Sequence, residues 1–406
     1  MPLTVRTIDA SELPGWVACM GEGFFKDLTD EYAEYFAGEV DFDRTWAAVD
    51  GKQVVGTLRS FETELTVPGS LPIPAAALTN VTVSATHRRN GLLTSMITAD
   101  LAASADRGEP VNILIASEYP IYGRFGYGPA VEGAAYSVDT VAVRFRQPSI
   151  GSVQRVDLAE LRRKAPQIYE RFRRAQPGAI KRSERWWDRT LRQVEVPGEK
   201  PPKGYAAIYR SPDGEAEGYL RYRGKQNWDN FRPQGTLVVE DLCAVTAAAY
   251  QRLWQYCCDI DLMTSIEAGT RSVHEPLPFL LADGRVVQQT GRHDFLWVRV
   301  LDVCASLAAR RYAADCRLVI DVPDPLGIAG GRYVLEAGVE GAQCTRTGET
   351  ADLTLPIDAL GSVYLGGTSL FALAAAGRVD EHRAGALAEA DTMFGSYRPP
   401  WCNTWF

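Results

Sequence analysis

The order hairpin, strand, helix occurs twice in this sequence, and it constrains the possible fold more than any other feature. The first copy comprises a hairpin around an Asp-Gly turn at 46–60, a strand at 75–83 and a helical pattern at 92–108. The second copy repeats the hairpin, again around Asp-Gly, at 205–222, and continues with a strand at 236–245 that runs directly into a helix. Repetition of this kind predicts two related α/β domains in one chain.

The last part of the chain has a different pattern. After about Thr290, strand-like segments mix with two short helical segments, which predicts a third, α+β unit. A chain of 406 residues is long enough for two or three domains, and 46% apolar and 23% charged residues are typical of chains that bury cores. We therefore expect domains at 1–145, 146–290 and 291–406.

Charge and apolar runs narrow the function. The chain carries 43 Lys and Arg against 51 Asp and Glu, a net charge of -8, which is the wrong sign for a nucleic-acid-binding protein and favours cationic partners. The N-terminus lacks a targeting pattern, and the densest run of small apolar residues, 370–376, is far too short to span a membrane. We therefore expect a soluble, cytoplasmic protein.

Cysteine and histidine spacing gives no indication of a metal site. The eight cysteines are scattered without a C-x-x-C motif, and no two of the four histidines lie four residues apart. We expect reduced, buried thiols and no bound metal.

A basic glycine turn at 86–93, T-H-R-R-N-G-L-L, joins a strand to a helix in the first copy. Free backbone N–H groups and the helix dipole attract anions at such a helix start. Arg88 and Arg89 add positive charge, and Gly91 lets the backbone approach a pyrophosphate closely. The alternative is a solvated basic turn before an ordinary surface helix.

The surroundings of this turn resemble the acetyl-CoA site of the GNAT superfamily of N-acetyltransferases. The sequence R-x-x-G lies between a strand and an amphipathic helix, and an apolar strand at 111–117 and the sequence Y-x-R-F-G-Y follow. The resemblance covers about residues 1–145. The matching segment of the second copy, 245–253, has neither the paired arginines nor the glycine. We therefore expect a degenerate second GNAT domain and one acetyl-CoA site per chain.

The tandem arrangement, the third unit and the terminal Phe406 resemble more particularly the Eis (enhanced intracellular survival) family of aminoglycoside N-acetyltransferases. The resemblance implies a C-terminal α+β domain similar to a sterol carrier protein, and a hexamer. Leu93 departs from the wider superfamily, which prefers Gly or Ala there. The residues that the resemblance places against acetyl-CoA are Val81, Thr82 and Val83 on a splayed strand, Arg89, Asn90, Gly91, Leu92, Leu93 and Thr94 at the pyrophosphate, and Ser117 and Glu118 beside the pantetheine arm.

Two residues match the catalytic groups of this family. Acetyl transfer to an amine needs a proton acceptor for the amine and a proton donor for the departing thiolate. Tyrosine stays protonated at neutral pH because its reference pKa is near 10, and Tyr122 matches the family's proton donor. The family's base is the chain's own terminal carboxylate, here that of Phe406. The alternatives are that Tyr122 is a core aromatic, as we expect for Tyr127, and that packing alone holds the terminus.

Acidic and aromatic residues interleave at 22–43, a combination that suits polycations. The resemblance implies a broad pocket for aminoglycoside or polyamine-like amines, to which this segment contributes. We expect Asp27 to anchor an amine, and Phe24 and Trp405 to contact the substrate. The alternative is a surface helix with its charged face in water.

Two other functions remain open. The layout with a C-terminal carboxylate also resembles N-myristoyltransferases, which use long-chain acyl-CoA. A non-catalytic lipid carrier is a further alternative, in which only the third domain binds a ligand.

Overall fold

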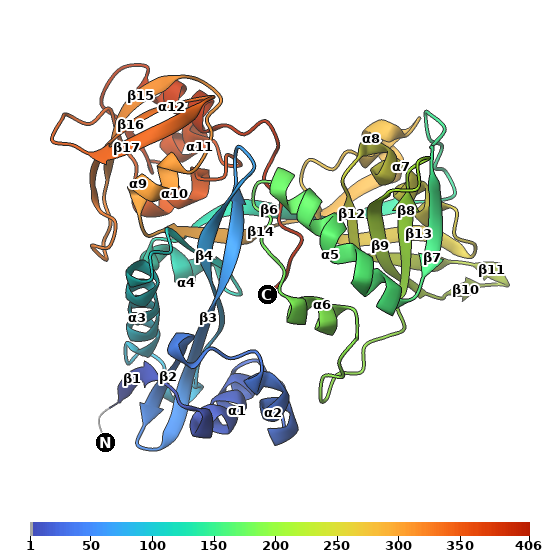
Figure 1. The fold of residues 1–406 in the computed structure, drawn as a ribbon, viewed down its shortest axis with the longest axis horizontal. Coiled ribbons are helices and arrows are strands. Elements are labelled where there is room, and N and C mark those ends of the chain that lie inside the picture. Colours follow the sequence, from blue (N-terminus) through green and yellow to red (C-terminus); the bar gives the residue numbers. More distant parts are fainter. Residues whose placement is uncertain (1–2) are drawn as a thin grey trace.

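The computed structural model describes residues 3–406, which form two lobes joined by a shared sheet, with a smaller unit packed on the first lobe (Figure 1). The shared sheet has 12 strands in the order β1-β2-β3-β4-β5-β14-β6-β13-β12-β9-β8-β7. Within these residues, no helix is long and apolar enough to cross a membrane.

The first lobe confirms the first hairpin–strand–helix prediction. An antiparallel meander leads to β5, which is parallel to β4, and the helix between them buries Leu92, Met96, Ile97 and Leu101 against the sheet. The elements are β1 (Thr4–Thr7), α1 (Leu13–Gly23), α2 (Asp30–Ala37), β2 (Thr45–Asp50), β3 (Gln53–Val67), β4 (Leu71–Val83), α3 (Leu92–Asp106), β5 (Val111–Ile115) and α4 (Tyr119–Tyr122).

The second lobe repeats this plan and confirms the internal duplication. Its parallel pair is β12 and β13, again with a helix between the two strands. The elements are β7 (Ser152–Val156), α5 (Leu158–Ala175), α6 (Glu184–Thr190), β8 (Tyr205–Arg210), β9 (Ala216–Lys225), β12 (Gly235–Ala244), α7 (Ala247–Cys258), β13 (Met263–Ser272) and α8 (Leu277–Leu280).

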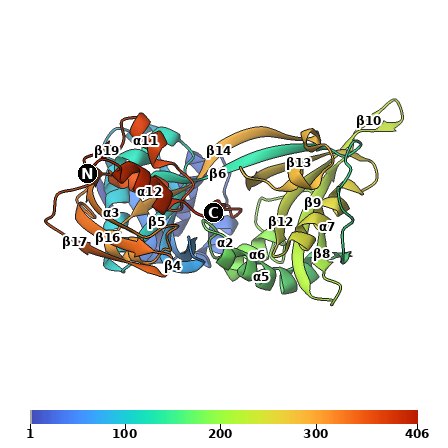
Figure 2. The ribbon, with the colours of Figure 1, turned by 90° about the horizontal axis from the view of Figure 1, so that it is seen from above.

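Two long strands join the lobes by crossing between them (Figure 2). β6 (Gly128–Asp139) pairs with β13 of the second lobe, and β14 (Val287–Val300) pairs with both β5 and β6. The boundary expected between residues 290 and 291 therefore lies inside β14, in a strand that both lobes use.

The third unit has a five-stranded sheet in the order β17-β16-β15-β18-β19. It packs closely on the first lobe, because a Cβ on Gly128 would lie 1.9 Å from the carbonyl oxygen of Asp358. A fully buried ion pair, Arg299 with Asp324 at 2.7 Å, ties β14 to this unit. The main elements are α9 (Val303–Ala308), β15 (Cys316–Val322), β16 (Gly331–Gly338), β17 (Gly341–Arg346), β18 (Leu353–Thr354), α10 (Ile357–Val363), α11 (Leu370–Ala375), β19 (Asp380–Glu381) and α12 (Ala386–Phe394).

The last residues leave α12 and return between the two lobes (Figure 1). Trp401, Cys402 and Thr404 are buried, Phe406 is half-buried, and Trp405 is 68% exposed. We call residues 399–406 the C-terminal tail. Its burial is therefore uneven, because the Trp405 side chain faces open space.

Candidate active site

A cavity of about 1470 Å³ lies where the two lobes and the C-terminal tail meet. Its walls come from segments far apart in the sequence: the end of α1 and α2, the facing parts of β3 and β4, the segment from 115 to 122, the segment around α6, the middle of β12, and the tail itself. This convergence makes the cavity the candidate active site.

The turn before α3 is an uncapped helix start. Gly91 is its N-cap residue with a left-handed φ of 75°, a conformation that glycine adopts at little cost, and no side chain caps the first N–H groups. Arg88 and Arg89 are exposed beside this turn, and α3 has 15 residues behind it. The turn can therefore accept an anion without displacing a side chain.

β4 and β5 separate just before this turn. Their parallel pairing ends at Leu78 and Leu114, whereas β4 continues to Val83. A bulge with Asn80 at a φ of 55° interrupts the pairing of β4 with β3 and bends the strand. The backbone of the last β4 residues is therefore free of a partner on the β5 side.

The residues expected at the cofactor fall into two groups. Seven line the cavity: Val81, Thr82, Val83, Arg88, Leu93, Ser117 and Glu118. Four others, Arg89, Asn90, Gly91 and Thr94, are exposed at the adjoining turn, and Leu92 is buried in the core at 5% exposure. Only the backbone of Leu92 can therefore meet a ligand.

Tyr122 is a buried side chain that lines the cavity at the end of α4. Burial raises the pKa of its hydroxyl to about 12, and the Glu118 carboxylate adds to this rise. The hydroxyl therefore keeps its proton. Tyr127 differs: its hydroxyl donates a 2.8 Å hydrogen bond to Asn112 inside the core, which is the structural role expected for it.

Arg182 fixes the C-terminal tail to the second lobe. Its guanidinium donates hydrogen bonds to Thr404 Oγ1 (2.9 Å) and to the carbonyl oxygen of Asn403 (3.1 Å), and it forms an ion pair with Asp241 at 2.8 Å. Burial alone would lower the pKa of Arg182, but Asp241 raises it above its usual range. The tail is therefore bound to a buried, permanently charged group.

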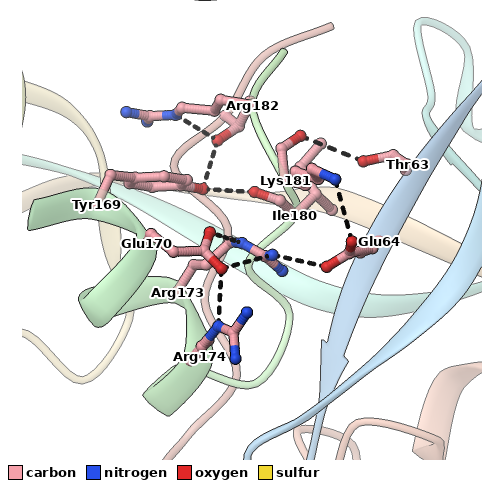
Figure 3. Close-up of polar contacts among 10 residues, drawn as sticks. Thr63, Glu64, Tyr169, Glu170, Arg173, Arg174, Ile180, Lys181 and Arg182 are labelled. Atoms are coloured by element: carbon pink, nitrogen blue, oxygen red, sulfur yellow. Dashed lines mark hydrogen bonds and ion pairs between the residues drawn. The ribbon is translucent and has the colours of Figure 1, made fainter. Parts of the chain in front are cut away.

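Further contacts join the tail to α5, and the segment 180–182 to the first lobe (Figure 3). The Tyr169 hydroxyl donates to the carbonyl oxygen of Ile180 at 2.8 Å and shares a hydrogen bond with Thr404. Lys181, next in sequence, forms an ion pair with Glu64 of β3 at 3.1 Å. These contacts connect the first lobe, α5 and the tail through the segment 180–182.

The tail ends inside the cavity. The Phe406 ring packs edge-on against Phe61 with 5.6 Å between ring centres, and Trp186 Nε1 donates a 3.1 Å hydrogen bond to the carbonyl oxygen of Trp405. Both tail residues line the cavity. Among residues 3–406, no cationic side chain forms an ion pair with the terminal carboxylate. The carboxylate therefore has no direct ion-pair partner among these residues.

Of the three residues expected to contact the substrate, two line the cavity and one does not. Phe24 and Trp405 line the cavity, whereas Asp27 is exposed and outside the lining. Of the acidic residues at 22–43, Glu22 and Glu39 line the cavity. The basic lining residues are Lys26, Arg59, Arg88, Lys181, Arg182, Arg185, Arg189, Arg192, Arg221 and Arg271, and the acidic ones are Glu22, Glu39, Glu62, Glu118, Glu199, Glu240 and Asp241.

Three residues of the site were not foreseen from the sequence. Arg59 and Phe61 lie two residues apart on β3 and thus on one face of it, the face that lines the cavity. Alternation along a strand indicates a shared face but not what that face meets. Arg182 lies in an Arg-rich segment whose composition does not single it out.

Comparison with known proteins defines the class. Residues 4–130 and 178–300 match two models described as acetyltransferase (GNAT) domains, and residues 303–403 match a sterol carrier protein domain. The chain is therefore an N-acetyltransferase of the GNAT superfamily, built from two GNAT domains and a sterol-carrier-like domain, and it uses an acyl-CoA cosubstrate. The fold class expected from the sequence is confirmed.

Full-length relatives define the family. The chain is 41% identical to an uncharacterized N-acetyltransferase of Streptomyces griseus, with 99% of each chain covered, and 37% identical to N-acetyltransferase Eis of Mycobacterium tuberculosis, with 98% of each covered. The crystal structure of Eis1 from Mycobacterium abscessus superposes with a TM-score of 0.87 at 32% identity and covers 99% of this chain and 100% of that chain. The chain belongs to the Eis-like family of GNAT N-acetyltransferases.

Proposed function

We propose that this enzyme transfers an acetyl group from acetyl-CoA to a primary amine of a small molecule, with Tyr122 as proton donor and the Phe406 carboxylate as proton acceptor. One observation carries the proposal. A single cavity is lined by the splayed end of β4, by a protonated tyrosine, and by a C-terminal residue whose carboxylate has no cationic partner.

The first lobe fits the CoA part of the cosubstrate. The backbone of Val81, Thr82 and Val83 has no strand partner on the β5 side, which suits the amides of a pantetheine arm, and Ser117 and Glu118 line the same cavity. The free N–H groups that follow Gly91, and the exposed Arg88 and Arg89, suit a pyrophosphate. Acetyl-CoA supplies an activated thioester.

The remaining chemistry belongs to the chain's own groups. The amine must lose a proton as its nitrogen bonds to the acyl carbon, and the Phe406 carboxylate receives that proton directly or through one water. The sulfur must gain a proton as its bond to the acyl carbon breaks. The Tyr122 hydroxyl supplies it, because burial keeps this hydroxyl protonated.

Aminoglycoside and polyamine-like amines are the substrates we propose to test first, because the family resemblance suggests them and the cavity is wide. The rings of Phe24 and Trp405 offer faces for cationic groups, and Asp27 is exposed between the lining residues Lys26 and Leu28. We also propose, from the same resemblance, a cytoplasmic homohexamer.

The test is release of the CoA thiol with purified protein and a panel of aminoglycosides, polyamines and lysine derivatives. Acetyl-CoA should support turnover, and myristoyl-CoA should not. Turnover with myristoyl-CoA alone would favour a long-chain acyltransferase. No turnover with any pair, together with co-purified lipid and no CoA affinity, would favour the lipid-carrier alternative.

A further inference from the structure

Arg59 is a buried cation that faces the cavity with part of its guanidinium free. It lies on β3, is 9% exposed and lines the cavity. Nε donates a hydrogen bond to Asn80 Oδ1 at 3.2 Å, and Nη1 donates to the carbonyl oxygen of Glu39 at 2.8 Å. Within residues 3–406, Nη2 has no hydrogen-bond acceptor, and it is not fully buried.

No carboxylate neutralises Arg59. The side chain of Glu39, whose backbone oxygen accepts from Arg59, forms its ion pair with Arg185 at 3.0 Å instead. Burial lowers the pKa of Arg59, and the partial compensation from Glu39 and Tyr32 is opposed by the positive charge of Arg189. A buried charge without a partner is costly, so such a group usually serves a ligand or a specific contact.

The other buried arginines have protein partners. Five of them form ion pairs with carboxylates: Arg44 with Glu109, Arg173 with Glu64 and Glu170, Arg182 with Asp241, Arg271 with Glu275, and Arg299 with Asp324. Arg310 lacks a carboxylate, but backbone carbonyl oxygens accept from its Nε, Nη1 and Nη2. Arg59 alone among these combines burial, no carboxylate partner and a position on the cavity wall.

Two aromatic rings pack against the Arg59 guanidinium, and one of them also contacts Phe406. Its central carbon lies 5.0 Å from the centre of the Phe36 ring and 5.6 Å from that of Phe61. The Phe61 ring in turn lies 5.6 Å from the Phe406 ring. Stacking fixes the planar fork that binds two oxygens of one oxyanion. Phe61 therefore contacts both the Arg59 guanidinium and the Phe406 ring.

We propose that Arg59 binds an anionic group, a carboxylate or a phosphate, on the same substrate whose amine is acetylated. This inference rests on the proposed function and narrows it from polycations towards amines that also carry an oxyanion. The free Nη2 on the cavity wall supports it. The incoming oxyanion supplies the partner that the protein lacks.

The test compares three amines of equal length in acetyl-CoA turnover: hexylamine, 6-aminohexanoate and 1,6-diaminohexane, with shorter and longer homologues to find the best spacing. The intact enzyme should prefer the amino acid by at least about tenfold in kcat/KM, because a charge-assisted hydrogen bond in a buried site is strong. An aminoalkylphosphonate series distinguishes phosphate from carboxylate. Preference for the diamine would overturn the inference and leave amine acetylation intact.

The substitution Arg59→Gln should abolish the preference for 6-aminohexanoate over hexylamine, and Arg59→Lys should retain part of this preference. The matched control is Lys181→Gln, which removes an exposed lysine from the same wall and leaves Glu64 paired with Arg173. This control should keep the preference. An unchanged preference in Arg59→Gln would contradict the inference.

Binding of hexanoate to the intact protein, measured by calorimetry, tests Arg59 without turnover or a variant. Hexanoate should bind and should compete with 6-aminohexanoate, whereas hexylamine should bind more weakly. Absence of hexanoate binding would contradict the inference. Hexanoate binding without turnover on any amine would support the anion site and overturn the proposed acetyl transfer.

Discussion

The two GNAT lobes have the same strand–turn–helix plan, but the first N–H groups of the helix are uncapped in the first lobe and capped by a side chain in the second. In the first lobe, Gly91 leaves the start of α3 without a side-chain cap. In the second, Thr246 caps α7: its Oγ1 accepts a hydrogen bond from the Ala249 N–H at 3.2 Å and donates one to Glu217 at 2.9 Å. The second helix start is thus satisfied internally and does not invite an anion.

The gap between the two parallel strands also differs between the lobes, because it is filled by a side chain in the second. β12 and β13 also separate, after Val239, but Arg271 fills the gap with a 3.0 Å hydrogen bond to the carbonyl oxygen of Leu242 and an ion pair with Glu275. Trp401 of the C-terminal tail covers the Arg271 guanidinium at 4.6 Å. The place of a ligand is taken by the protein itself.

The short helices after the parallel strands complete the contrast. α4 has the sequence Y-P-I-Y and ends in Tyr122, whereas α8 has the sequence L-P-F-L and ends in Leu280. The second lobe therefore lacks the proton donor as well as the anion site. It serves instead as the anchor of the tail, through Arg182 and Asp241.

The largest expected effect concerns Tyr122, which the second lobe replaces with leucine. The substitution Tyr122→Phe should lower kcat at least about 100-fold, because a positioned proton donor contributes that much or more, and should leave CoA affinity unchanged. Steady-state kinetics and calorimetry measure the two quantities. As control, Tyr127→Phe should cost about 1 kcal/mol of stability and keep kcat. Equal loss of kcat in both variants would argue against a special role for Tyr122.

The second largest effect is expected at Arg182, through which the second lobe binds the C-terminal tail. The substitution Arg182→Gln leaves Asp241 buried without its partner and should lower the free energy of unfolding by about 3 kcal/mol. It should also lower kcat while CoA affinity stays, because the tail loses its position. Chemical denaturation and turnover measure these effects. As control, Arg299→Gln breaks another buried ion pair and should lower the free energy of unfolding by a similar amount without lowering kcat. An equal fall of kcat in Arg299→Gln would show that lost stability, and not the position of the tail, lowers kcat in Arg182→Gln.

A smaller effect is expected at the turn itself. The substitution Gly91→Val forces a β-branched residue into a left-handed conformation and should weaken CoA binding about tenfold, since the strain is roughly 1–2 kcal/mol. The matched change in the other lobe, Thr246→Ala, should cost about 1 kcal/mol of stability and leave CoA binding unchanged. Calorimetric titration with CoA distinguishes them. Weaker CoA binding in Thr246→Ala would contradict the assignment of the site to the first lobe.

The smallest expected change is in the pH profile. Because the pKa of Tyr122 is raised to about 12, its proton is lost only as the pH rises through that value. Between about pH 7 and 10, kcat should therefore show no decline caused by Tyr122. A decline in this range that disappears in Tyr122→Phe would show that the hydroxyl titrates earlier than the structure indicates.

The sequence predicted the duplicated plan because hairpin turns, apolar periodicity and a basic glycine turn are local signals. Tyr122, Phe24 and Trp405 were also expected at the site, and all three line the cavity. The shared strand β14 could not be foreseen, because its pairing with β5 joins residues almost two hundred positions apart. The same holds for Arg182 and Arg59, whose importance arises from contacts between segments distant in the sequence.

The most direct test of the account adds one glycine after Phe406. The tail contacts of Arg182 remain, but the carboxylate moves by one residue, about 3.6 Å along the chain. The account predicts loss of acetyl transfer with CoA affinity and stability intact. Unchanged turnover on the same amine would contradict the role of the Phe406 carboxylate as proton acceptor.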